Sequence, residues 1–365
     1  MNFNEISEIL GIKIIIAIVM SFALTRFIIP LVVKVAHAKS MYAVPNRRSS
    51  HKRTIPNIGG VGIFLGFMVT SLLLANGEEI IKLQYILLGA LIIFLVGFTD
   101  DLIVLAPLTK LSGQFLAAAI VCLVGGLDFK YLEVFGTGEL PQWLSGTIAV
   151  FSVVFLMNAI NLIDGIDGLA ASLGASIMCF FGAWFWLNGL HNWAIIAMAY
   201  MAALLAFLPF NVYNWKEKLF MGDNGSMLLG FMTSIFVIHF INLHAQSYEL
   251  EYPFAAPTSI ALATVFVPIV DMFHVFILRM YRGKSPFSAD KEHIHHNLLT
   301  LGCSHVQATA LITLFNIIIL FFAIFLSNFI PSTWELIVLI VLAIVLRQIP
   351  FFLIQRKKIM VRKRK

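Results

Sequence analysis

Eleven long apolar runs dominate the sequence, each close to the length of about 20 residues that a helix needs to cross a bilayer. Short segments rich in glycine, proline and charge separate them. Backbone polar groups within lipid must be bonded inside their own segment, and the runs are continuous rather than alternating, so we expect helices. The runs lie near 12–34, 58–75, 83–99, 111–127, 145–163, 169–187, 193–212, 226–244, 258–281, 308–329 and 334–354.

Composition favours an all-α polytopic membrane protein. Hydrophobic residues make up 60% of the chain and charged residues 12%, against about 45–50% and 25% in globular domains. Too few charges remain to cover a water-soluble fold, and three isolated cysteines form no disulfide framework. Eleven spans leave roughly 145 residues for loops, too few for a soluble domain. We therefore expect residues 1–365 to form one integral-membrane domain.

Lysine and arginine set the expected orientation, because they concentrate in cytoplasmic loops. With the loop after the first run placed inside, 20 of the 25 fall in inside loops or the tail. Outside loops hold only Lys82 and Lys130. This predicts an outside N-terminus and a cytoplasmic C-terminus. The net charge of +6 then reflects orientation and predicts no nucleic-acid partner, while the basic tail at 355–365 should contact anionic lipid.

The dense polar clusters all fall in loops on the predicted cytoplasmic side, near 37–57, 100–110, 158–168, 211–225 and 282–306. The orientation rests on lysine and arginine alone, so the grouping of Asp, Asn and His on one side is an independent observation. Five loops at one face can converge. We therefore expect them to build one site at the inner surface of the membrane.

Two of these clusters place carboxylates at helix ends. Asp100 and Asp101 close the third run, where acids oppose the helix dipole; the plain alternative is a solvated helix end. Asp223 stands between Gly222 and Gly225, just before the eighth run. A carboxylate beside a helix N-terminus and a glycine turn suits a site for a metal ion and a phosphate. The alternative is that Asp223 only caps the helix.

A third cluster repeats polar side chains at every third residue: Asn158, Asn161, Asp164 and Asp167. Glycine follows each Asp, which permits backbone conformations that a helix does not need. The alternative is a polar seam that holds two helices together. Two carboxylates and two carboxamides are a costly way to join helices in lipid, which favours function.

The fourth cluster contains His293, His295 and His296, with Asp290 close by. These side chains could form a zinc site, a set of donors to an anion, or a solvated loop. No H-E-x-x-H pattern and no nearby cysteine support zinc. His51, in a basic stretch of the first inside loop, is a further candidate.

Many carboxylates without a thiol or a Ser/His/Asp arrangement suggest Mg²⁺, which prefers oxygen ligands. The surrounding lysine, arginine and histidine suggest an anionic substrate. Together they describe phosphoryl transfer, in which catalysis is mainly positioning and neutralisation of charge. The sequence has no G-x-x-x-x-G-K-[ST] loop, so ordinary nucleotide hydrolysis is not expected.

Five motifs in this order resemble the polyprenyl-phosphate N-acetylhexosamine-1-phosphate transferases. They are Pro45-Asn46…His51…Pro56-Asn-Ile-Gly59-Gly60, Asp100-Asp101, Asn158-x-x-Asn161-x-x-Asp164-Gly-x-Asp167-Gly-Leu169, Phe220-Met-Gly-Asp223-x-Gly-Ser226 and Asp290-x-x-His293-x-His295-His296. The His-x-His-His form is similar to the undecaprenyl-phosphate N-acetylglucosamine-1-phosphate transferases. One departure is Ala43, where the family often has Asp.

The resemblance implies a reaction, its cofactor and its place. A UDP-amino sugar gives its sugar 1-phosphate to undecaprenyl phosphate, with release of UMP, as the first step of a cell-envelope polysaccharide. Mg²⁺ would assist, with Mn²⁺ as a substitute, at the cytoplasmic face of a bacterial plasma membrane. The sequence leaves the oligomeric state open, a homodimer being one option.

The resemblance also implies roles for individual residues. Asp223 and Asp164 would bind the metal ion, and Asp100 would act on the lipid phosphate with Asp101 in support. Asn211 and Phe220 would hold the uracil. The catalytic side chains would be Asp100, Asp101 and Asp223. The substrate-binding side chains would be His51, Asn158, Asn161, Asp164, Asp167, Asn211, Phe220, His293, His295 and His296.

Other functions fit parts of the pattern. The same chemistry could use another UDP-2-acetamido sugar or UDP-N-acetylmuramoyl-pentapeptide. An ion-coupled transporter would place acids near the middle of the bilayer, for which Asp271 is the main candidate. A structural membrane scaffold would have no need for aspartates followed by glycine.

Overall fold

The computed structural model describes residues 3–39, 55–75, 83–132, 134, 138–213, 217–245, 249–283 and 293–362. These form a helical bundle with one short antiparallel ribbon, in which Tyr131 pairs with Glu139. The elements are α1 (Phe3–Ala38), α2 (Gly60–Leu74), α3 (Leu83–Ile103), α4 (Pro107–Ala119), η1 (Ile120–Val124), β1 (Tyr131–Leu132), β2 (Gly138–Glu139), α5 (Gln142–Ile163), α6 (Leu169–Leu187), α7 (His191–Val212), α8 (Gly222–Ala245), α9 (Pro257–Thr264), α10 (Phe266–Tyr281), α11 (Ile294–Leu301), α12 (His305–Leu326) and α13 (Ser332–Arg362).

Every apolar run expected from the sequence falls on a helix. Among the described residues, eight helices are long and apolar enough to cross a membrane, and the bent pair α9 and α10 gives a ninth. Two shorter apolar helices, Gly60–Leu74 and Ser332–Leu346, cover the remaining runs. The prediction of an all-helical, multi-pass membrane protein is confirmed, whereas the count of eleven spans and the orientation stay predictions.

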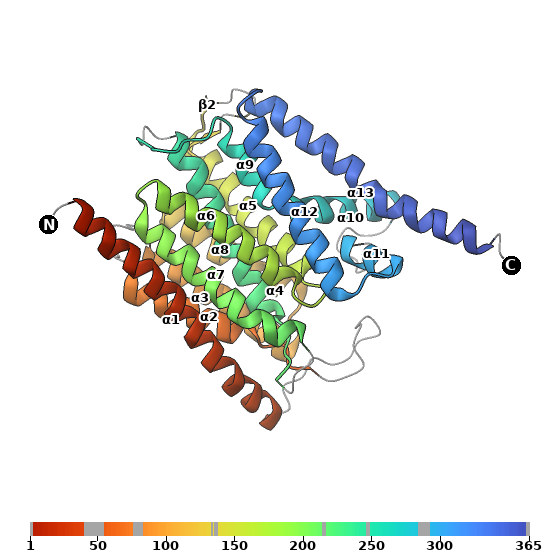
Figure 1. Ribbon diagram of the computed structural model, residues 1–365, viewed down its shortest axis with the longest axis horizontal. Coiled ribbons are helices and arrows are strands. Elements are labelled where there is room, and N and C mark those ends of the chain that lie inside the picture. Colours follow the sequence, from red (N-terminus) through yellow and green to blue (C-terminus); the bar gives the residue numbers. More distant parts are fainter. Residues whose placement is uncertain are drawn as a thin grey trace.

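Helix α8 lies at the centre of the bundle, with α1 along one flank and α13 along the opposite flank (Figure 1). Its residues are buried almost from end to end. Small residues let neighbouring helices approach it closely: a methyl group added at Gly97 of α3 would collide with the Asn224 backbone. The buried α8 therefore fixes the place of its first turn, which carries Asp223.

The ninth run, expected as one helix over 258–281, is instead broken at Val265, and α9 and α10 are bent by 75°. Pro268 accounts for the break, because a proline has no N–H and its ring displaces the carbonyl four residues earlier. That carbonyl, of Thr264, accepts a hydrogen bond from Asn316 Nδ2 of α12 at 2.8 Å. The Asn316 Oδ1 in turn accepts from the Val267 N–H at 3.1 Å.

Candidate active site

The Asp101 carboxylate caps the first turn of α8. Its Oδ1 accepts a hydrogen bond from the Asp223 N–H at 2.9 Å, and its Oδ2 accepts from the Asn224 N–H at 3.0 Å. The Asn57 side chain adds a third hydrogen bond to Oδ1 at 2.6 Å. A carboxylate at a helix N-terminus bonds the otherwise unpaired N–H groups and complements the helix dipole. Asp101 therefore holds Asp223 in place.

Two motifs far apart in the sequence form one unit beside this cap. The Phe220 N–H donates to Pro56 O at 2.8 Å, and the Gly59 N–H donates to Phe220 O at 2.9 Å. Gly222 has a φ of 75°, and a methyl group there would collide with the Asn57 carbonyl. Only glycine suits this position. The first-loop segment and the turn before α8 therefore depend on each other.

Lys110 joins the two central carboxylates. Its Nζ lies 3.2 Å from Asp100 Oδ2 and forms an ion pair with Asp223 Oδ2. Asp100 also accepts from the Leu105 N–H at 2.6 Å. Two carboxylates this close repel each other, and the ammonium group offsets that repulsion. Sequence reasoning used Lys110 only to orient the chain and missed this role.

The asparagines of the third motif lie at two depths. Asn161 Nδ2 donates to Asp223 Oδ1 at 2.7 Å and to Ser226 Oγ at 2.8 Å, which joins the end of α5 to the start of α8. Asn158 lies almost one turn earlier on α5 and donates to Gln114 Oε1 at 2.7 Å. Asn161 thus belongs to the carboxylate cluster itself, while Asn158 supports it through the buried Gln114.

The pKa values of Asp164 and Asp167 are shifted in opposite directions, although the two residues are only three positions apart. Burial, with the nearby charges of Asp223 and Asp167, raises the pKa of Asp164 to about 7. Burial also disfavours the charge of Asp167, but hydrogen bonding by His305 and Lys218 outweighs it and lowers the pKa of that carboxyl. Lys218 Nζ lies 2.7 Å from Asp167 Oδ2. Asp167 is therefore a paired anion, whereas Asp164 changes charge near neutral pH.

Asn211 joins the loop after α5 to the loop before α8. Its Oδ1 accepts from the Gly168 N–H at 2.5 Å, and its Nδ2 donates to Leu219 O at 3.1 Å. Gly168 has a φ of 80° and is the N-cap of α6. Both ends of the buried Asn211 amide are thus bonded to backbone, while Phe220 beside it is half-buried. The predicted contacts of both with uracil stay predictions.

The histidine cluster contacts the loop between α5 and α6 that carries Asp164 and Asp167. His295 packs directly on Gly165, where a methyl group would collide with its ring. Burial and the neighbouring His296 lower the pKa of His295 to about 3, so this ring is neutral at physiological pH. Its buried Nδ1 has no hydrogen-bond partner among the described residues, which leaves a polar atom for a ligand. His293 is bonded to Asp271.

The structure thus brings together the described members of four predicted clusters at one end of the bundle. His51 and Asp290 lie outside the described residues, and their predicted roles stay predictions. Sequence reasoning missed several partners whose side chains bond the cluster: Asn57, Lys110, Gln114, Lys218 and His305. The two lysines had one available signal, since each stands within a few residues of an apolar run beside a carboxylate motif.

Within the described ranges, no three His, Cys, Asp or Glu side chains are spaced to hold a metal ion alone. This arrangement still fits Mg²⁺, which usually takes one or two protein carboxylates and completes its shell with water and phosphate oxygens. Asp223 already pairs with a cation, the Lys110 ammonium group. Asp164 lies near enough to Asp223 for the negative charge of Asp223 to raise the pKa of Asp164. The donor set is thus oxygen-rich and selects for positive charge.

A large apolar cavity of about 830 Å³ is lined by helices that lead to the cluster. Phe155 of α5, Phe273 of α10 and Ala343 of α13 are among its lining residues. Helix α5 ends directly before Asp164, and α10 carries Asp271. The cavity and the polar cluster therefore share α5 and α10.

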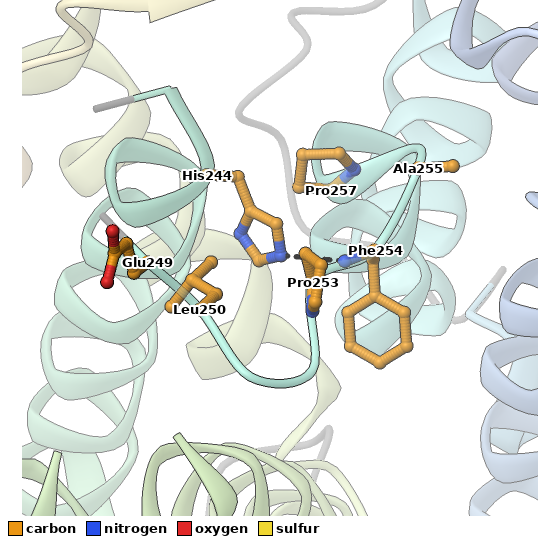
Figure 2. A pocket seen from close by; sticks show the side chains of 7 residues that line it. All are labelled: His244, Glu249, Leu250, Pro253, Phe254, Ala255 and Pro257. Atoms are coloured by element: carbon orange, nitrogen blue, oxygen red, sulfur yellow. Dashed lines mark hydrogen bonds between the residues drawn. The ribbon is translucent and has the colours of Figure 1, made fainter. Parts of the chain in front are cut away.

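A smaller pocket of about 340 Å³ lies at the opposite end of α8, where the His244 ring faces the segment 249–257 (Figure 2). The His244 Nε2 accepts a hydrogen bond from the Phe254 N–H at 3.1 Å. Asp223 and His244 lie near opposite ends of α8, roughly 30 Å apart at 1.5 Å per residue. This pocket is therefore separate from the candidate active site.

The ion pair between Asp167 and Lys218 gives a first prediction. Changing Lys218 to Met should lower kcat/KM by about tenfold, because the buried Asp167 carboxylate keeps His305 but loses its ion pair with Lys218, which costs roughly 1–3 kcal/mol and loosens the loop that carries Asp164. Lys218→Arg should keep most of the activity. The exchange Asp167→Lys with Lys218→Asp should recover part of what either single charge change loses. A steady-state assay of all variants measures this, and equal activity of Lys218→Met and wild type would contradict it.

Fold and site together define a multi-pass membrane protein whose acidic, amide and imidazole side chains converge at one end of a helical bundle. Residues 83–241 match the model of glycosyl transferase family 4. The chain is 31% identical over 319 residues to the decaprenyl-phosphate N-acetylglucosaminephosphotransferase of Mycobacterium leprae (strain TN), a match that covers 82% of this chain and 80% of the relative. The chain belongs to glycosyl transferase family 4, as the five motifs suggested.

Two further relatives carry related names. The probable undecaprenyl-phosphate N-acetylglucosaminyl 1-phosphate transferase of Bacillus subtilis (strain 168) is 30% identical over 341 residues, 93% of this chain and 91% of the relative. The undecaprenyl-phosphate alpha-N-acetylglucosaminyl 1-phosphate transferase of Escherichia coli (strain K12) is 30% identical over 316 residues, 85% of this chain and 83% of the relative.

Proposed function

We propose that the protein transfers N-acetylglucosamine 1-phosphate from UDP-N-acetylglucosamine to a polyprenyl phosphate, undecaprenyl phosphate in the first instance, and releases UMP. The observation that carries this proposal is the meeting of Asp100, Asp223 and Lys110 at one end of a membrane bundle. The names of the three relatives support the acceptor and the sugar. The lysine and arginine bias supports a site at the cytoplasmic face of a bacterial plasma membrane.

The chain's own residues orient two phosphate-bearing substrates. Lys110 offers its ammonium group to phosphate oxygens, and Asp100 orients the lipid phosphate. A phosphate monoester has a second pKa of about 6, so it needs little help from Asp100 to reach its dianionic form. Asn161 and Asp101 keep Asp223 in position through side-chain and helix-cap hydrogen bonds. The neutral His295 ring offers its Nδ1 to the sugar or diphosphate.

Asp223 and Asp164 would hold Mg²⁺ in this proposal. When bound, the ion neutralises charge on the phosphate oxygens during transfer. Asp223 is fixed by Asp101 and Asn161. Asp164 follows the last residue of α5, and its backbone N–H makes a long hydrogen bond to Asn161 O, at 3.3 Å.

The apolar cavity supports a lipid acceptor. Its walls come from helices of the bundle that include α5 and α10, and its exposed lining is almost wholly hydrophobic. A polyprenyl chain has no polar group except its phosphate. An apolar cavity that shares two helices with a cationic and amide-rich site therefore matches both ends of the molecule. Water-soluble acceptors would gain nothing from such a cavity.

The raised pKa of Asp164 gives a second prediction. Below a pH of about 7 the protonated form of Asp164 predominates, and a carboxyl must lose its proton before it can bind a metal ion. Apparent Mg²⁺ affinity should therefore rise as the pH is raised from about 6 to 8. In Asp164→Asn this dependence should flatten. Calorimetric titration with Mg²⁺ across this range measures both, and a slope unchanged by Asp164→Asn would contradict the assignment.

A donor panel tests the proposed function and separates it from its nearest rivals. Purified protein would be incubated with undecaprenyl phosphate and UDP-N-acetylglucosamine, another UDP-2-acetamido sugar, or UDP-N-acetylmuramoyl-pentapeptide. We expect UMP release and a lipid-linked product with the first donor, only when lipid phosphate and Mg²⁺ are present. Turnover with the muramoyl donor alone would favour transfer of phospho-N-acetylmuramoyl-pentapeptide instead, and no turnover with any donor would reject the proposal.

The ion-coupled transporter loses its main support. It requires Asp271 as a relay near the middle of the bilayer, but Asp271 bonds the start of α11, whose His295 packs on Gly165 of the candidate site. Asp271 therefore lies at the same end of the bundle as the other acids.

A further inference from the structure

The bend between α9 and α10 has a consequence for the histidine cluster. Asn316 bonds two backbone groups on either side of the break at Val265, Thr264 O and the Val267 N–H. The direction of α10 is therefore fixed by a side chain from α12, because unpaired backbone groups within a membrane are costly. Asp271 lies on the bent helix α10 and is only 3% exposed.

Both oxygens of Asp271 bond the beginning of α11. Oδ1 accepts from the Ile294 N–H at 2.8 Å, and Oδ2 lies 2.7 Å from His293 Nδ1. An ionised carboxylate can only accept hydrogen bonds, so His293 must carry its proton on Nδ1. The Nε2 atom is then the ring nitrogen that points away from Asp271. One carboxylate thus caps a helix and selects the tautomer of a histidine.

The orientation of His293 reaches the loop that carries Asp164. The His293 ring stacks parallel to the His295 ring, with 5.6 Å between centroids and 6° between planes. His295 in turn packs on Gly165. The position of His293 therefore depends on Asp271, and the packing of His295 on the loop depends on His293.

From this geometry we infer that Asp271 is a positioning residue of the transfer reaction: it holds His293 with Nδ1 protonated and with Nε2 as an acceptor for a hydroxyl or N–H group of the bound sugar nucleotide. The inference rests on the proposed function and deepens it. A second nitrogen bonded to a carboxylate is a common way to fix which ring atom a histidine presents to its ligand. The simpler reading is that Asp271 serves only as the N-terminal cap of α11.

Asp271→Asn separates these readings, because asparagine keeps the cap and reverses the tautomer. Its Oδ1 can still accept from the Ile294 N–H, which places the amide Nδ2 where Oδ2 was. Nδ2 is a donor, so His293 Nδ1 must now accept and the proton moves to Nε2. The variant should unfold at nearly the same temperature as the wild type, while kcat should fall on the order of 100-fold with little change in KM.

The test combines kinetics with nitrogen-15 NMR of histidine-labelled, full-length protein in detergent, with His293→Gln used to assign the signal. The expected result is an Nδ1–H tautomer in the wild type, an Nε2–H tautomer in Asp271→Asn, and the fall in kcat. Asp128→Asn is a matched control, because Asp128 is also buried but lies beside Asn242 near the other end of α8. Asp271→Ala should lose the cap as well and unfold at a lower temperature.

Two results would overturn the inference: an unchanged tautomer in Asp271→Asn, or a changed tautomer with wild-type kcat. Failure of the proposed function looks different. In that case the wild type itself would not transfer sugar phosphate to the lipid, while the NMR signals would still report whether Asp271 selects the tautomer of His293.

Discussion

Replacing Asp223 by asparagine should lower kcat by about 1,000-fold, which corresponds to roughly 4 kcal/mol of lost charge stabilisation. Asparagine has nearly the same shape and can still accept the hydrogen bond from Asn161 Nδ2. It loses the negative charge that holds Lys110 and that would hold Mg²⁺. Release of UMP from UDP-N-acetylglucosamine in the presence of undecaprenyl phosphate and Mg²⁺ measures the effect.

The control for this variant is Asp128→Asn, because Asp128 lies beside Asn242 near the far end of α8, and this variant should keep activity close to that of the wild type. Both variants should be extracted from membranes as folded protein, because Asp101 caps α8 through backbone N–H groups that the substitution at 223 does not remove. Near-normal turnover by Asp223→Asn would eliminate Asp223 as the metal ligand.

Replacing Lys110 by methionine should have the second largest effect, a fall of about 100-fold in kcat/KM. Methionine keeps much of the apolar stem but removes the charge that bridges Asp100 and Asp223. The two carboxylates then repel each other and the anionic substrate, so KM for the UDP-sugar should rise. Affinity for Mg²⁺ should rise as well, because the ion no longer competes with an ammonium group for Asp223.

The matched control is Lys130→Met, because Lys130 is an exposed lysine at the opposite end of the bundle. This variant should leave kcat/KM and the affinity for Mg²⁺ unchanged. Steady-state kinetics and calorimetric Mg²⁺ titration measure the two quantities separately. Weaker Mg²⁺ binding in Lys110→Met would contradict competition between the ammonium group and the metal ion.

The helices are predictable from the sequence, because the apolar runs record the length of a bilayer crossing directly. The bend at Val265 is not predictable from the sequence, although Pro268 signals that the helix could break there. A proline within a membrane helix can be accommodated without a sharp break, and the bend depends on Asn316 from another helix. Such a long-range partner cannot be read from a local pattern.

The candidate site divides in the same way. The sequence predicts that Asp100, Asp164 and Asp223 meet, because each stands at the end or the beginning of an apolar run at one face of the membrane. In the structure Lys110 bridges Asp100 and Asp223, and the charge of Asp223 raises the pKa of Asp164. The partner of Asp167 is not predictable, because Lys218 is 51 residues away in sequence. A straight helix over the ninth run would place its aspartate near the middle of the bilayer, and the bend instead places it at the end with the histidines.

In the proposed function, carboxylates from separate loops would hold one divalent ion beside the phosphates of a sugar nucleotide. Electron paramagnetic resonance with Mn²⁺ in place of Mg²⁺ tests this most directly, with UDP-N-acetylglucosamine bound to the purified protein. We expect one bound Mn²⁺ with phosphorus-31 hyperfine coupling in the wild type, and loss of both in Asp223→Asn. The same Mn²⁺ affinity and the same coupling in Asp223→Asn would show that the ion is held elsewhere.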